Sequence, residues 1–209
     1  KKTQDEPKKT AVEQAVLDYF ESQVTGENLC LVHATNNTVG SKMFTARDFE
    51  EASKTLGDNR TSNFGINELA VLSGIEEGTV SGIEEGTVGR STMGKKGYYV
   101  LIVNANEVGY EDVLAACHNN SSLRGFVVPA NGSTKSTTGK TVLANGHFTC
   151  LKTTETGYWD IDSMKNKREL THHERITPSN YFKSIGECPT VAAIFEGLGG
   201  HQDFIKRIV

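Results

Sequence analysis

The chain has 209 residues, a formal net charge of −4 and no strongly basic segment. This length buries one substantial core, so we expect a single domain over residues 10–209 after a disordered or linker segment at 1–9. The acidic charge argues against a nucleic-acid partner, which requires a basic face. No apolar run approaches the roughly 20 residues that cross a bilayer, so we expect no membrane association. Because the chain begins without a methionine, we expect it to be one module of a larger protein.

The cysteines give the next constraint. No two of them form a CxxC pair, which argues against a tetrahedral zinc site, and four thiols are too few for a disulfide scaffold in a chain of this size. We therefore expect free thiols, no metal, no cofactor and a reducing, cytoplasmic setting. The four cysteines are Cys30, Cys117, Cys150 and Cys188.

Helical patterns dominate the first third of the chain. Apolar residues at helical spacing predict an amphipathic helix over 11–22 and a largely buried helix over 30–38. Thr45 and Asp48 form a capping-box pattern that begins a helix over 46–56. A short helix is expected over 67–73.

An unaltered tandem copy follows these helices. The octapeptide SGIEEGTV occupies residues 73–80 and again 81–88. Two copies of eight residues are too few and too short for a solenoid. Since loops tolerate insertion, we expect residues 73–88 to be an exposed loop or short hairpin.

Strand patterns dominate the remainder and determine the fold class. Helices that precede strands in this way predict an α+β fold in which an N-terminal helical lobe packs on an antiparallel β-sheet. The expected elements are strands over 98–103 and 124–128, a hairpin of 141–151 with 157–161, a helix over 110–118, a polar connection over 170–178, an apolar helix over 189–198, and a strand or helix end over 204–209.

Cys30 is the first candidate for chemistry, because it follows a glycine turn at the start of a predicted helix. Only the thiolate is a nucleophile, and a helix N-terminus stabilises the anion through the helix dipole. His147 lies on a predicted strand just after Asn145-Gly146, and Asp160 and Asp162 are two residues apart, so that they share a face of the neighbouring strand. A histidine that activates a cysteine needs an acid to hold its ring, and either aspartate satisfies this pattern. His33, one helical turn after Cys30, is expected to pack or cap the helix.

These segments resemble the Josephin deubiquitinases, which belong to the papain-like cysteine peptidases. The resemblance implies a papain-like fold with Cys30 as nucleophile, His147 as general base and then acid, and Asp162 as the orienting acid, with Asp160 second. It also implies a substrate: the peptide or isopeptide bond after the C-terminal Gly-Gly of ubiquitin or a ubiquitin-like modifier. The matching motifs are Leu29-Cys30-x-x-His33-x-x-Asn36-Asn37, Phe44-Thr45-x-x-Asp48-Phe49, His147-Phe148-Thr149 and Tyr158-Trp159-Asp160-Ile161-Asp162-Ser163.

One position departs from the family pattern. The family places a glutamine a few residues before the cysteine, where it helps to stabilise the oxyanion. Here Gln23 stands seven residues before Cys30, which requires a longer turn, while Thr25 occupies the expected place and Asn28 is a possible substitute. Gln23 is therefore the candidate oxyanion donor, beside the backbone N–H of Cys30.

Three alternatives stay open. His147 and Asp162 could act with Cys188, in the order found in SUMO proteases. The chain could be a protease that processes its own polyprotein. It could also be an inactive peptidase fold that only binds ubiquitin.

Overall fold

The computed structural model describes residues 14, 18–75, 83–85, 90–104, 109–129, 147–177, 180 and 190–197. Within these ranges the helices are α2 (Cys30–Val39), α3 (Ala46–Thr55), α4 (Ile66–Leu72), α5 (Thr92–Lys95), α6 (Tyr110–His118) and a 3₁₀ turn at Lys167–Glu169. The strands described are β1 (Ile83–Glu85), β2 (Tyr98–Asn104), β3 (Leu123–Pro129), β4 (Phe148–Thr153), β5 (Gly157–Ile161), β6 (Thr171–Glu174) and β7 (Thr190–Glu196).

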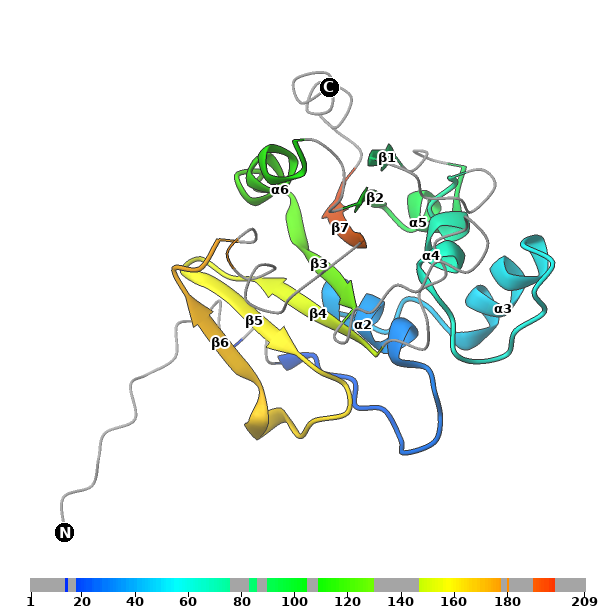
Figure 1. The fold of residues 1–209 in the computed structure, drawn as a ribbon. Coiled ribbons are helices and arrows are strands. Elements are labelled where there is room, and N and C mark those ends of the chain that lie inside the picture. Colours follow the sequence, from blue (N-terminus) through cyan, green and yellow to red (C-terminus); the bar gives the residue numbers. More distant parts are fainter. Residues whose placement is uncertain are drawn as a thin grey trace, which may run out of the picture.

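The strands of these ranges form one sheet in the order β1-β2-β7-β3-β4-β5-β6 (Figure 1). Every neighbouring pair in it is antiparallel. The molecule thus has the mixed helical and antiparallel character of the α+β class, as predicted.

Helices cover both faces of the sheet. Alternate residues of a strand point to opposite faces, and β2 shows this: Tyr98, Val100 and Ile102 join a core with α2, α3 and α4. Tyr99 and Leu101 join a second core with α6 on the other face. The predicted helical lobe is therefore the layer on the first face, and α6 is an additional cover on the second. Helix α2 packs on β3 and β4, which places its first residue near the strand ends.

Most predicted elements are confirmed by the structure. Helices α2, α3, α4 and α6 and strands β2, β3 and β5 occupy their predicted positions within one or two residues. The capping box that begins α3 is present, since the Thr45 backbone N–H donates to Asp48 Oδ2 at 2.8 Å. The predicted hairpin is β4–β5, although β4 runs on to Thr153 before the turn.

The apolar helix predicted over 189–198 is wrong, because this segment is strand β7 at the centre of the sheet. It pairs with β2 on one side and β3 on the other, and Thr190 to Phe195 are all buried. A short apolar run that is buried on both faces has no periodicity to separate a strand from a helix. Its length of 7 residues favours the strand.

Two other expectations need correction. The polar connection over 170–178 contains β6, which pairs with β5 at the sheet edge. The helix predicted over 11–22 does not extend past Asp18. Its predicted last turn is instead held to α2, because the Glu21 backbone N–H donates to Asn37 Oδ1 at 2.8 Å and its carbonyl accepts from Asn37 Nδ2 at 3.1 Å.

The duplicated octapeptide is described only in part. Its first residues end α4 and are not exposed, since Ser73 and Ile75 have exposed fractions of 1% and 5%. Residues 83–85 of the second copy form the edge strand β1. The expectations for 1–9, for 141–146 of the predicted hairpin and for 204–209 fall outside the described residues. Among the helices of the described ranges, none has the length and apolar character needed to cross a membrane.

Candidate active site

Cys30 is the first residue of α2 and is partly exposed. The chain reaches it through a turn in which Gly26 has φ +89°, a left-handed conformation that suits glycine. The first turn of α2 contains no acidic residue. The positive end of the helix dipole therefore acts on the sulfur without a nearby carboxylate on the same turn, which favours negative charge at this position.

His147 and Asp162 come together because their strands are neighbours. His147 directly precedes β4, Asp162 directly follows β5, and Cys150 of β4 pairs with Ile161 of β5. His147 Nε2 lies 2.5 Å from Asp162 Oδ1, and both side chains are largely buried, at 17% and 15% exposure. This distance is that of a strong, charge-assisted hydrogen bond.

The contacts of Asp162 and His147 favour the charged form of each side chain. Burial acts to raise the pKa of Asp162, but hydrogen bonds from His147 and from the Met164 backbone N–H outweigh it and hold the pKa below its ordinary value. The hydrogen bond to Asp162 raises the pKa of His147 to about 9, with a second contribution from a hydrogen bond to Cys30. Because Nε2 faces Asp162, the ring presents Nδ1 to the thiol. An imidazolium beside a thiol can stabilise the thiolate.

The alternative acid and the other thiols have different surroundings. The Asp160 carboxylate lies 4.0 Å from His173 Nε2 on the neighbouring strand β6, whereas Asp162 contacts His147. Cys117 is fully buried, and burial raises its pKa to about 12. Burial likewise raises the pKa of Cys150 to about 11. Cys188 lies outside the described residues.

The backbone of Gln23 contacts the residue that follows Asp162. Its backbone N–H donates to the carbonyl of Ser163, the residue after Asp162, at 2.7 Å. A turn accommodates the long spacing to Cys30: the Glu27 N–H donates to the Val24 carbonyl at 3.0 Å, and Gly26 occupies its left-handed position. The seven-residue separation therefore still lets the Gln23 backbone reach the loop after β5, and its role as oxyanion donor stays a prediction.

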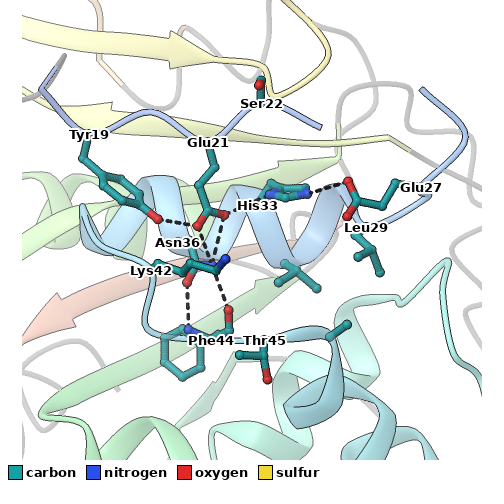
Figure 2. Close-up of a pocket in the computed structure, with 12 residues that line it drawn as sticks. Tyr19, Glu21, Ser22, Glu27, Leu29, His33, Asn36, Lys42, Phe44 and Thr45 are labelled. Carbon is teal, nitrogen blue, oxygen red and sulfur yellow. Dashed lines mark hydrogen bonds and ion pairs between the residues drawn. The ribbon is translucent and has the colours of Figure 1, made fainter. Parts of the chain in front are cut away.

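A polar network behind α2 was not identified from the sequence. The network lines a cavity of about 510 Å³. Figure 2 shows the Glu21 carboxylate between the side chains of His33, Asn36 and Tyr19. His33 Nδ1 lies 2.9 Å from Glu21 Oε2, so His33 has the structural role expected of it. The only sequence signal for this network is that His33 and Asn36 share one motif with Cys30.

These residues provide the kinds of functional group that acyl transfer requires. The site contains a partly exposed thiol at a helix start, a histidine that contacts both it and a buried carboxylate, and a carboxamide on the adjoining segment.

Comparison with known proteins adds an independent observation. A family model described as Josephin matches residues 25–182, which is most of the chain. The matched segment contains Cys30, His147 and Asp162, while Gln23 lies just before it and Cys188 beyond it. No curated protein matches the chain.

Proposed function

The chain belongs to the Josephin family of papain-like cysteine-protease deubiquitinases, and from this premise we propose that it hydrolyses the bond after the C-terminal Gly-Gly of ubiquitin or a ubiquitin-like modifier. The observation that carries the proposal is His147, which contacts Asp162 at 2.5 Å and hydrogen-bonds Cys30 at the start of α2. Cys30 is the nucleophile, His147 the proton carrier and Asp162 the residue that orients the imidazole.

Acylation begins with attack of the Cys30 thiolate on the carbonyl carbon of the terminal glycine. The negative charge moves to the carbonyl oxygen, where the Cys30 backbone N–H and the Gln23 side-chain amide donate hydrogen bonds. His147, held through Nε2 by Asp162, then donates its proton from Nδ1 to the departing amine. A thioester and a free lysine or N-terminal amine result.

Deacylation reverses these roles. The neutral His147 accepts a proton from water, and the resulting hydroxide attacks the thioester carbonyl. The tetrahedral intermediate collapses to regenerate the thiolate beside the imidazolium and to release the modifier's carboxylic acid, which loses its proton to bulk water. A tail of two glycines suits this chemistry, because it lets the substrate backbone approach Cys30 without a side chain in the way.

Hydrolysis of ubiquitin that carries a fluorogenic C-terminal amide tests the proposal. The wild type and Cys188→Ser should release the fluorophore, and Cys30→Ala should not, while circular dichroism shows that all three are folded. A folded wild type that leaves ubiquitin and its relatives intact would contradict the proposed activity. Activity that survives Cys30→Ala but is lost in Cys188→Ser would move the nucleophile to Cys188.

A further inference from the structure

Gln23 is the candidate oxyanion donor, and one atom of its carboxamide lacks a partner among the residues that the structure describes. Its Oε1 atom is buried and, within the described residues, has no hydrogen-bond partner. The hydrogen bond by which Gln23 is held in the described part of the chain runs from its backbone N–H to the Ser163 carbonyl. The direction of the side chain therefore depends on how the segment around it is fixed.

Glu21, two residues earlier, is the most strongly held residue of that segment. Its backbone makes two hydrogen bonds with the Asn37 side chain of α2. Its carboxylate accepts hydrogen bonds from the Tyr19 hydroxyl, from Asn36 Nδ2 at 3.0 and 3.2 Å, and from His33 Nδ1 at 2.9 Å (Figure 2). The carboxylate is only 14% exposed, so these bonds are shielded from water and from salt.

His33 connects the two ends of the same segment. Its Nδ1 atom faces Glu21, and its Nε2 atom lies 3.4 Å from Glu27 Oε2. The same Glu27 oxygen accepts from the Val24 N–H at 3.1 Å. One imidazole thus joins a carboxylate before Gln23 to a carboxylate after it, and the segment is held to the helix that carries Cys30.

Asn36 connects the Glu21 carboxylate to the chain segment that follows α2. Its Nδ2 atom donates to the Phe44 carbonyl at 2.9 Å as well as to Glu21, and its Oδ1 atom accepts from the Met43 and Phe44 backbone N–H groups. Asn36 is 1% exposed, so it is a rigid partner for the Glu21 carboxylate.

We propose that Glu21 is a positioning residue: its carboxylate, bound to His33, Asn36 and Tyr19, holds the Glu21–Glu27 segment on α2 so that the Gln23 amide faces the oxyanion formed at Cys30. This inference rests on the proposed function for its catalytic consequence. Glu21 does not touch the substrate. It acts through Gln23, so the loss of either residue removes the same stabilisation of the transition state.

Kinetics with the fluorogenic ubiquitin amide test the link between the two residues. Gln23→Ala should lower kcat by about 10²-fold or more, as removal of an oxyanion donor does. Glu21→Ala should lower kcat by about tenfold or more with KM nearly unchanged, because the lost interaction forms only in the transition state. Glu21→Gln, which keeps an acceptor oxygen, should be intermediate, and the double variant should be no slower than Gln23→Ala alone.

Two controls separate positioning from general damage. Alkylation of Cys30 by iodoacetamide forms no oxyanion, so its rate should be the same in Glu21→Ala and the wild type. Damage to the fold would slow both reactions. Glu51→Gln changes an exposed glutamate on α3 that pairs with Lys54, and it should leave every rate unchanged.

Amide hydrogen exchange tests the positioning without ubiquitin. The Gln23 N–H should exchange about tenfold faster or more in Glu21→Ala, while the Met164 N–H, which donates to Asp162 Oδ1, should keep its rate. Unchanged exchange at Gln23, or a double variant slower than Gln23→Ala by the full Glu21→Ala factor, would overturn the proposal. If the wild type cleaves no ubiquitin substrate, the proposed function fails, and the exchange result alone decides the role of Glu21. If Glu21→Ala does not fold, Glu21→Gln takes its place in each comparison.

Discussion

Replacement of Asp162 has a consequence that follows from the pKa of His147. That pKa is about 9 against an ordinary 6.5, with the Asp162 hydrogen bond as the largest cause and Cys30 next. The difference of about 2.5 pH units corresponds to about 3.4 kcal/mol in favour of the imidazolium. Because Asp162 is the larger of two contributors and burial opposes both, Asp162→Ala should lower the pKa by at least about one pH unit, or about 1.4 kcal/mol.

The value of kcat/KM should decrease together with the pKa of His147. A loss of about 1.4 kcal/mol from the charged pair corresponds to about a tenfold lower kcat/KM near neutral pH. Asp162→Asn keeps an oxygen that can accept from Nε2–H and loses only the charge. We therefore expect the order wild type, Asn, Ala for activity, with the Asn variant separating orientation of the ring from stabilisation of its charge.

The assay is a pH titration of the histidine ring protons by NMR from pH 5 to 10, alongside kcat/KM for the fluorogenic ubiquitin amide. His33 is an internal control, because its pKa is raised by Glu21 first and by Glu27, not by Asp162. Asp160→Ala is the matched control for loss of an acid from the same hairpin. An unchanged pKa of His147 in Asp162→Ala, or a larger decrease in Asp160→Ala, would refute the reasoning.

Three further predictions concern the scaffold around the site. Burial lowers the pKa of Lys152 to about 8 from 10.5, so between these values the Lys152 side chain binds its proton more fully in the unfolded chain than in the folded one. The free energy of urea unfolding of the wild type, taken relative to that of Lys152→Met, should therefore rise by up to about 3 kcal/mol from pH 8 to 10.5, and a constant difference would contradict this. A Cβ at Gly157 would collide with the His173 carbonyl, so Gly157→Ala should cost about 3 kcal/mol or more by thermal unfolding. Gly57→Ala, at φ +80° with open space around it, should cost only about 1 kcal/mol; equal costs would contradict the steric argument. Asn36→Ala leaves the buried Phe44 N–H and C=O without their partner and should lower the free energy of unfolding by about 2–4 kcal/mol; a cost below about 0.5 kcal/mol would show that Asn36 is not a structural anchor.

The elements that could be predicted are those whose signals are local. The capping box of Thr45 and Asp48 begins α3 where expected, and α2 begins at Cys30 after its glycine turn. Strand β7 was predicted as a helix, because its neighbours β2 and β3 are distant in the sequence and its buried run has no periodicity of its own. Strand β6 was missed for a related reason: at a sheet edge, its pairing with β5 rather than its polar composition makes it a strand.

The functional residues also separate into those with a local sequence signal and those without one. Cys30 and His147 stood out because each belongs to a motif. The residues alone left Asp160 and Asp162 open, and the family resemblance favoured Asp162. Strand β5 stops at Ile161, which leaves Asp162 in the loop against His147 and Asp160 beside β6. The role proposed for Glu21 could not be predicted, because its partners on α2 lie 12 to 16 residues away across a turn.

The central claim is that Cys30 forms the covalent bond to the modifier. Ubiquitin that ends in a propargylamide, mixed with the wild type, should give one covalent adduct, and peptide mapping by mass spectrometry should place it on Cys30. Cys117 and Cys150 should remain unmodified in the same digest, since both are buried. Attachment at Cys188, or a folded wild type without any adduct, would contradict the account.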